Sequence, residues 1–142
     1  MEAGFVVDNS VVMAWCFKDQ ANAYADSVLE RLADTVAYVP SVWPLEVVNV
    51  LLAAERKRSM SQANSVRFIS LVSELPIIVE NDNFEKTMKE LLGLARAHDL
   101  SSYDASYLEL AMRKGLPLAT LDDKLRKAAA HASVPILFIR LP

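Results

Sequence analysis

The sequence predicts an α/β fold in which helices cover both faces of a central, mostly parallel, five-stranded sheet, forming a three-layer α/β/α sandwich. Two observations predict this fold. Short apolar runs rich in β-branched residues alternate along the whole chain with longer segments of helical period. The apolar runs also lack the alternation of a half-exposed strand, as expected for strands that are covered on both faces.

Five apolar runs are expected to form strands, and most of the remaining chain has the period of helices. The strands are predicted at residues 5–7, 37–39, 77–79, 116–120 and 136–139, and the helices at 22–33, 42–57, 62–75, 83–97, 102–114 and 123–132. Capping residues agree with these bounds. Ser61 is suited to cap a helix, Asp82 with Glu85 forms a capping-box pattern, and Gly115 follows a helix end.

Length and composition predict one domain over residues 1–142. The chain is 53% hydrophobic and 23% charged, which is typical of a compact protein and not of a disordered one. We find no apolar stretch of roughly 18 residues and no basic signal region, so we expect a cytoplasmic protein without a membrane span. One cysteine and two histidines cannot form a Cys/His zinc site, so any metal must bind to oxygen. The net charge of −3 argues against a large cationic surface for nucleic acid.

Acidic residues follow two of the predicted strands. Asp8 follows the run FVV of the first strand, and Asp122 comes shortly after Thr120 at the end of the fourth. Parallel strands that run side by side end at the same edge of their sheet, and open α/β folds bind ligands at that carboxyl edge. We therefore expect Asp8 and Asp122 to lie at one rim of the molecule.

Two further acids are expected at the same rim, although they belong to helices. Glu46 lies about one turn into the helix that follows the second strand. Asp104 lies in the first turn of a helix that only a short turn at Gly115 separates from the fourth strand. That helix must end at the amino edge and begin at the carboxyl edge, so four carboxylates that are distant in sequence converge.

Carboxylates that lie together repel one another, so they either take up protons or bind a cation. Mg²⁺ or Mn²⁺ prefers such oxygen ligands and is commonly completed by a substrate phosphate. The pattern therefore indicates hydrolysis of phosphodiester bonds. We expect Asp8, Asp104 and Asp122 to bind the metal, and Glu46 to be a further ligand or to position the attacking water.

Each acid also has a purely structural interpretation. Asp8 and Asp122 can each cap the helix that follows them, and Asp104 fits a capping box with Ser101. Coincidence of all these roles at one edge is improbable, which favours the metal site.

Other polar residues near the acids leave two interpretations open. Glu46 lies on a very apolar helix and needs a polar partner, which Asn49, three residues further on the same face, could supply. The cations that follow Asp122 either contact RNA phosphates or form a solvated helix face; they are Lys124, Arg126 and Lys127.

Three motifs carry a resemblance to a known family. They are VVDNSV, PSVWPLEVVNVLL and AHDLSSYDASYLELAMRKGLPLATLDDKLRKAA, and their order and spacing are specific although each one alone is weak. Through them the chain resembles the PIN-domain ribonucleases, and among these the small VapC-type toxins of toxin–antitoxin modules. The resemblance covers essentially the whole chain and implies a PIN-like form of the α/β fold.

The resemblance also implies an activity and its site. Asp8, Glu46, Asp104 and Asp122 match the family's acidic quartet, which binds Mg²⁺ or Mn²⁺ and cleaves single-stranded or loop regions of RNA. The implied protein is thus a metal-dependent endoribonuclease, a hydrolase acting on RNA.

Four more residues are expected around this metal site. Ser10 matches the family's hydroxyl residue two positions after the first acid, and Thr120 the one two positions before the last acid. Asn49 and Asp123 each neighbour one of the acids in sequence and are expected to support them.

The resemblance further implies a homodimer whose activity a cognate antitoxin neutralises by covering the site. An apolar surface beyond one core face needs a cover. The very apolar helix at residues 42–54, with the helix at 62–75, is therefore where we expect the interface.

Three other functions compete with a nuclease. An aspartate-nucleophile phosphotransferase usually needs a second aspartate two residues after the first, where this chain has Ser10. A receiver domain needs a lysine after its fifth strand, and FIRLP contains none. The remaining alternative is a PIN-like module that binds a partner without catalysis; the intact quartet argues against it, and metal binding separates the two.

Overall fold

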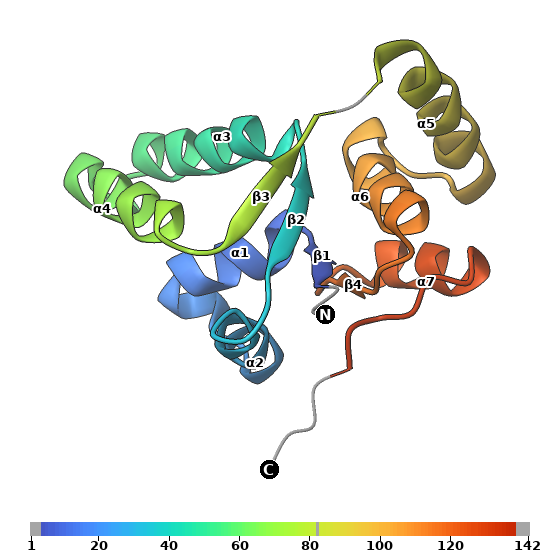
Figure 1. The fold of residues 1–142 in the computed structure, drawn as a ribbon. Helices are drawn as coiled ribbons and strands as arrows, with labels where there is room; N and C mark the ends of the chain where they lie inside the picture. Colours follow the sequence, from blue (N-terminus) through green and yellow to red (C-terminus); the bar gives the residue numbers. More distant parts are fainter. Residues whose placement is uncertain (1–3, 82, 139–142) are drawn as a thin grey trace.

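The central sheet contains four strands in the order β3-β2-β1-β4 (Figure 1). The computed structural model describes residues 4–81 and 83–138. Within them the strands are β1 (Phe5–Val7), β2 (Ala37–Pro40), β3 (Ile77–Glu80) and β4 (Leu118–Ala119). Each neighbouring pair is parallel, which confirms the parallel sheet that the sequence predicts.

The described sheet has four strands rather than the predicted five. In place of the fifth, Ile136 forms a single parallel bridge with Leu118. Two hydrogen bonds flank this bridge: Leu118 N–H donates to Pro135 O at 2.9 Å, and Leu137 N–H donates to Leu118 O at 2.8 Å. The pairing stays short because β4 has only two residues. Ile139, where the predicted strand ends, lies outside the described residues.

Seven α-helices and one 3₁₀-helix connect these strands in the described part of the chain. They are α1 (Asn9–Cys16), η1 (Lys18–Gln20), α2 (Ala23–Arg31), α3 (Trp43–Arg56), α4 (Gln62–Ser73), α5 (Phe84–His98), α6 (Ser102–Lys114) and α7 (Asp123–His131). Six of them lie within a few residues of the predicted helices. Ser61 caps α4 and Gly115 ends α6 as predicted, whereas Asn83 caps α5; the capping residue predicted there, Asp82, lies outside the described residues.

The predicted helix ranges do not include α1, although a helix that begins near Ser10 is considered as one that Asp8 could cap. The burial of α1 explains why its range is missing. The four consecutive residues Val11, Val12, Met13 and Ala14 are all buried. A helix that is apolar on every side has no helical period in its sequence, so periodicity alone does not detect it.

The helices form layers on both faces of the sheet, as the three-layer prediction requires. Figure 1 shows α1–α4 on one side of the sheet and α5–α7 on the other. Helix α6 packs directly against β1 and β2, and α5 and α7 pack against α6. The three-layer α/β/α architecture is therefore confirmed.

The core centres on β1 and α6. Phe5, Val6 and Val7 are fully buried because β1 lies between β2 and β4, and α6 contributes Leu108 and Leu110 to the same core. Full burial of such side chains stabilises the fold by about 1.5–3 kcal/mol each. The end of β1, where Asp8 follows, is thus anchored in the buried core.

Gly4 supports the approach to β1 and provides a test of this packing. Its φ is +83°, and an added Cβ atom would lie 2.6 Å from Val36 O. Backbone strain of this kind costs about 1–3 kcal/mol, so we expect Gly4→Ala to lower the free energy of unfolding by that amount. Urea unfolding followed by circular dichroism measures it.

Gly93→Ala is the matched control, because Gly93 lies within α5 and nothing stands within 4 Å of its added Cβ. This change is expected to stabilise the helix by up to about 1 kcal/mol. Equal effects of the two substitutions would contradict the assigned strain at Gly4.

The order of the strands indicates where a ligand would bind. The chain moves outward from β1 to β2 and β3, and then returns to β4 on the other side of β1. In open α/β sheets, ligands bind at such a reversal, outside the carboxyl ends of the two strands. That point lies after Val7 of β1 and Ala119 of β4. Among the described helices, none is long and apolar enough to cross a membrane.

Candidate active site

Asp8 follows β1 and is held through both carboxylate oxygens. Its Oδ1 accepts hydrogen bonds from Ser10 Oγ at 2.5 Å, Ser10 N at 3.1 Å and Val11 N at 3.4 Å. Its Oδ2 accepts one from Thr120 Oγ1 at 2.6 Å. The side chain caps α1, as the structural interpretation proposes, and is only 4% exposed.

Burial raises the pKa of Asp8 to about 6. Hydrogen bonds from Ser10, Thr120 and Val11 favour the charged form and oppose part of this rise, while the nearby charge of Asp104 adds to it. The residue is thus an ionised carboxylate at neutral pH that lies in a setting unfavourable to its charge. A bound cation would relieve that cost.

Ser10 and Thr120 connect the carboxyl ends of β1 and β4. Besides donating to Asp8, Ser10 Oγ accepts from Leu121 N at 3.0 Å, and Thr120 Oγ1 accepts from Asp122 N at 3.0 Å. Each hydroxyl therefore connects the Asp8 carboxylate to the backbone that follows β4. The structure places both predicted hydroxyl residues against this acid.

Glu46 lies in the first turn of α3 and is paired with a tyrosine of α6. Tyr107, which is 1% exposed, donates its hydroxyl hydrogen to Glu46 Oε1 at 2.5 Å. Burial raises the pKa of Glu46, and the hydrogen bond from Tyr107 opposes that rise. The side chain of Asn49, the partner suggested from the sequence, makes no hydrogen bond in the described part of the chain; Tyr107 of α6 takes that role instead.

Asp104 lies in the first turn of α6, where Ser101 caps the helix. Ser101 Oγ accepts from Asp104 N at 3.1 Å, so the capping interaction expected from the sequence is present. Burial raises the pKa of Asp104, and the charge of Asp122 raises it further. Ser101 and Lys124 act in the opposite direction. Asp104 thus takes part in the capping interaction of α6 and also belongs to the acidic group.

Asp122 is the N-cap of α7. Its Oδ1 accepts from Lys124 N at 2.9 Å and from Leu125 N at 3.4 Å, which fixes the orientation of the carboxylate. Its neighbour Asp123 is exposed in the first turn of α7 and makes no hydrogen bond or ion pair within the described residues. The side chain of Asp122 is therefore hydrogen-bonded at the site, whereas that of Asp123 is not.

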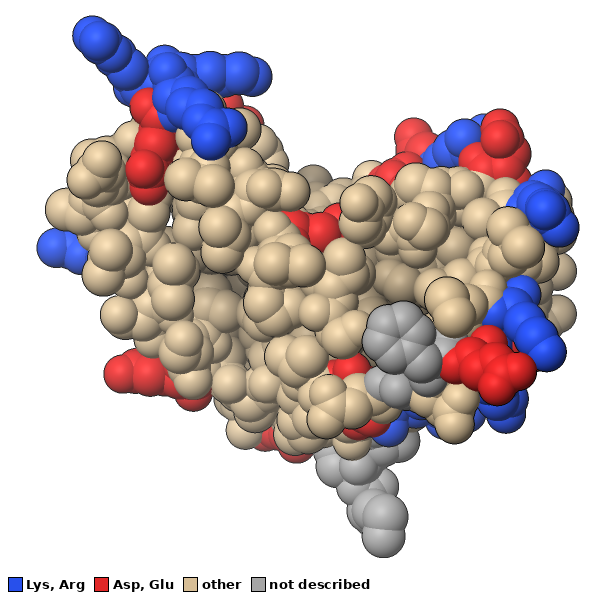
Figure 2. Space-filling model, turned by 90° about the horizontal axis from the view of Figure 1, so that it is seen from above, with Lys and Arg blue, Asp and Glu red and all other residues tan. Residues whose placement is uncertain are grey.

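Asp104 is the electrostatic centre of the four acids. Its charge adds to the raised pKa of Asp8 and of Glu46, and Asp122 in turn acts on Asp104. Figure 2 looks onto the end of the molecule where β2 and β3 terminate, and it shows carboxylates at the bottom of a notch between two lobes. Lysine and arginine side chains gather at the outer parts of these lobes.

The donor set suits Mg²⁺ or Mn²⁺, because it consists of carboxylates supported by hydroxyls. Across residues 4–81 and 83–138, no three acidic, histidine or cysteine side chains stand close enough to hold an ion by themselves. Mg²⁺ usually keeps several waters and binds through one or two carboxylates together with substrate phosphate. The residues therefore fit an ion that the substrate helps to bind, and not a closed protein cage.

Comparison with known proteins decides the family. The family model of the PIN domain matches residues 5–131, nearly the whole chain. This chain belongs to the PIN domain family. PIN domains are typically nucleases that use divalent metal ions, which agrees with the acidic group at the carboxyl edge of the sheet.

Solved structures share this PIN fold. The structure of PAE2754 from Pyrobaculum aerophilum aligns with a TM-score of 0.69 and 25% sequence identity, over 90% of this chain and 87% of that one. The structure of FitAcB from Neisseria gonorrhoeae aligns with a TM-score of 0.63 and 14% identity, over 94% of this chain and 96% of that one. A search of curated proteins finds no significant match.

Sequence reasoning missed two residues that support the acids of this PIN domain. Tyr107 was not singled out, because its role depends on a contact between α3 and α6 that no local pattern reveals. Arg126 was considered only for RNA contact or a solvated face, yet its guanidinium donates to Thr120 O at 3.1 Å. Lys124 forms an exposed ion pair with Asp99 at 3.4 Å.

Proposed function

We propose that this PIN domain is a metal-dependent endoribonuclease that hydrolyses phosphodiester bonds of RNA. The observation that carries the proposal is the electrostatic group centred on Asp104, to which four separate elements contribute an acid. Such a group is costly to maintain without a cation, and PIN domains are typically nucleases.

The proposed metal is Mg²⁺ or Mn²⁺, with Asp8, Asp104 and Asp122 as its ligands. When bound, the ion supplies activation of a water molecule and neutralisation of charge that develops on the phosphate. Ser10 and Thr120 keep the Asp8 carboxylate in one orientation. These contacts lower the entropic cost of metal binding, because the Asp8 side chain is already ordered before the ion binds.

Glu46 is proposed to position the attacking water or to act as a further ligand. Tyr107 donates a hydrogen bond to Oε1 of this carboxylate. The bond orients the Glu46 side chain, which extends from the first turn of α3. Tyr107 is a positioning residue in this proposal, since it acts through Glu46.

Titration with Mn²⁺ by calorimetry tests the proposal directly, before any choice of RNA. Saturable binding that Asp104→Asn weakens, together with metal-dependent cleavage of a mixed single-stranded RNA pool, is the expected result. Binding absent even with a non-hydrolysable oligonucleotide present would instead favour a module that binds a partner without catalysis. That alternative draws support from the lack of three converging ligands in the described residues.

We further propose that the protein is a VapC-type toxin of a type II toxin–antitoxin module, active in the cytoplasm and blocked by a cognate antitoxin. The match of the sequence motifs to such toxins and the shared PIN fold support this assignment. Co-expression with the protein encoded by an adjacent gene tests it: rescue of growth is expected if that protein is the antitoxin.

A homodimer is part of this proposal, and exposed apolar residues on α3 and α4 support an interface there. Val66 is 65% exposed, and Val48 and Ile69 are also exposed. Val66→Asp places a charge on this surface and is expected to shift a dimer to monomer, because burying an unpaired carboxylate is costly. Sedimentation velocity over a range of protein concentrations measures the shift.

Met88→Asp is the control for this experiment, because Met88 is 55% exposed on α5, away from the proposed interface. It is expected to leave the sedimentation coefficient unchanged. If the dimer persists with Val66→Asp but dissociates with Met88→Asp, the interface lies on α5 instead.

A further inference from the structure

A cavity of about 320 Å³ lies directly beside the candidate active site. Its lining contains one acid, two amides, one aromatic ring and three aliphatic side chains: Glu46, Asn9, Asn49, Tyr103, Val42, Leu45 and Val50. We propose that this cavity binds a nucleobase of the RNA substrate, belonging to a nucleotide next to the cleaved bond. The inference rests on the proposed nuclease function and adds a site that selects the substrate.

The position of the cavity connects it to the acids. Glu46 lines it, Asn9 directly follows Asp8 in the chain, and Tyr103 directly precedes Asp104. A phosphate held at the acidic group would therefore have its own nucleoside, or the neighbouring one, within reach of the cavity. The four other cavities that we compared with it contain none of the four candidate acids in their linings.

The chemistry of the walls suits a base rather than a phosphate. Glu46 is the only charged residue in the lining, so nothing there would neutralise a phosphate. Tyr103 is 55% exposed, which leaves its ring available for stacking. Val42 and Val50 supply apolar surface for the flat faces of a base. Stacking on an aromatic ring is a sequence-tolerant way to hold single-stranded nucleic acid.

The two amides can recognise the polar edge of the base. Each asparagine side chain offers both a donor and an acceptor, which is the combination that pairs with base edges. The Asn9 amide oxygen is buried without a hydrogen-bond partner, and the side chain of Asn49 makes no hydrogen bond within the described residues. Neither amide is committed to stabilising the fold through that group, so both remain available to a ligand.

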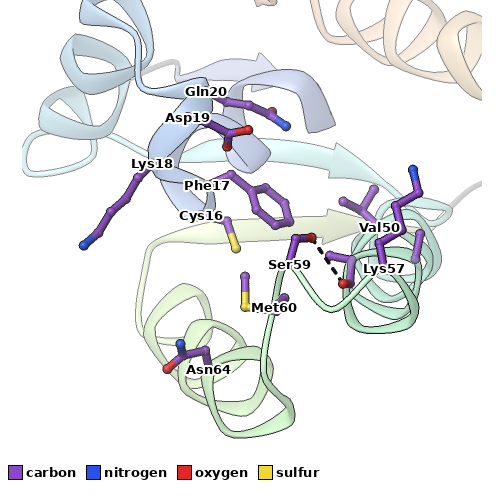
Figure 3. A pocket seen from close by; sticks show the side chains of 12 residues that line it. Cys16, Phe17, Lys18, Asp19, Gln20, Val50, Lys57, Ser59, Met60 and Asn64 are labelled. Carbon is purple, nitrogen blue, oxygen red and sulfur yellow. Dashed lines mark hydrogen bonds between the residues drawn. The ribbon is translucent and has the colours of Figure 1, made fainter.

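A second, larger cavity shares one lining residue with this one. Val50 also lines a cavity of about 540 Å³ between the end of α1 and the start of α4 (Figure 3). In Figure 3 the Phe17 ring points into this space, whereas Lys18 points away from it. The size of the smaller cavity falls at the lower end of the roughly 300–1,000 Å³ of small-molecule sites, as one base requires.

Binding of short RNA under non-cleaving conditions tests the proposal. Fluorescein-labelled A₈, C₈ and U₈ are titrated with the full chain in Ca²⁺, with anisotropy as the readout. Parent protein is expected to bind all three with a preference for one. Tyr103→Ala is expected to weaken binding of each by about tenfold through lost stacking, and Tyr103→Phe to restore it. Asn49→Ala is expected to reduce the preference among the three by several-fold.

Met88→Ala is the matched control, since Met88 is as exposed as Tyr103 but lies on α5. It should bind like the parent, and urea unfolding of every variant confirms that the fold is intact. If the parent binds and cleaves RNA but Tyr103→Ala and Asn49→Ala keep its affinities, the base pocket is wrong and the nuclease proposal stands. If those variants lose only affinity for a protein partner, the cavity is a protein-binding site. A parent that binds Mn²⁺ but none of the RNAs overturns both proposals, because the substrate class would then be wrong.

Discussion

Asp8→Asn is expected to abolish measurable Mn²⁺ binding and to reduce RNA cleavage at least about 100-fold, while the protein remains folded. Asparagine has nearly the same shape and is as good a helix N-cap as aspartate, so the start of α1 is preserved. The substitution removes the charge that a cation needs. Loss of function therefore separates metal binding from the capping role that Asp8 also fulfils.

The same substitution is expected to affect the stability of the metal-free protein in the opposite direction. The pKa of Asp8 rises from 3.8 to about 6 on folding, mainly because the group is buried. Folded protein thus holds its proton more tightly than unfolded protein, and stability falls as pH rises from about 4 to about 6. Above pH 6 the full penalty is present, and at roughly 1.4 kcal/mol per pKa unit it amounts to about 3 kcal/mol at most.

Asp8→Asn removes this penalty, so at pH 7 its free energy of unfolding is expected to equal or exceed that of the parent by up to about 3 kcal/mol. Below pH 4 the difference should disappear. Urea unfolding at a series of pH values in EDTA measures it. Asp123→Asn, an exposed change in the first turn of α7, is the control and should alter neither stability nor metal binding. If the Asp8→Asn variant binds Mn²⁺ as tightly as the parent, Asp8 is not a metal ligand.

A buried acid that destabilises the metal-free protein indicates a functional role. Asp8 is almost completely buried at the end of a fully buried strand, where a neutral capping residue would cost less. Ser10 and Thr120 reduce the cost but do not remove it, since the pKa stays raised. Stability given up at one position in this way is characteristic of active sites.

The sequence was sufficient to predict the architecture because the elements are of types that leave clear patterns. Strand β1 and helix α6 were located to the residue, because the first is a short apolar run and the second has a serine cap and a terminal glycine. Helix α1 was missed because it is buried on all sides. The fifth strand was overestimated because an apolar run shows that a segment is buried, but not how many residues of its neighbour are available for pairing.

The site could be predicted only as far as topology determines it. That Asp8, Glu46, Asp104 and Asp122 share one edge follows from the direction of the strands and helices. Which groups hold them does not, because a hydrogen bond such as that from Tyr107 to Glu46 joins residues 61 positions apart. The sequence also presented capping and metal binding as alternatives, whereas Asp122 caps α7 and still acts on Asp104.

Tyr107→Phe is expected to lower kcat/KM for RNA by about 10- to 100-fold, the effect typical of losing a group that orients a catalytic side chain. The change deletes one hydroxyl and leaves the ring in the core. Without it, Glu46 Oε1 loses a donor in a half-buried setting, so the carboxylate is neither oriented nor stabilised in its charged form. Burial and the nearby charge of Glu46 raise the pKa of Tyr107, so its hydroxyl stays protonated and acts as the donor.

Tyr24→Phe provides the matched control for this experiment. Tyr24 also donates its hydroxyl hydrogen within the fold, to Leu137 O at 2.9 Å, but not to one of the four acids. Both substitutions remove one part-buried hydrogen bond and are expected to lower the free energy of unfolding by about 1 kcal/mol. Only Tyr107→Phe is expected to lower kcat/KM, measured on a cleaved RNA at saturating Mn²⁺. If both variants lose activity and stability in equal proportion, Tyr107 supports the fold alone, and the orientation of Glu46 must come from the first turn of α3.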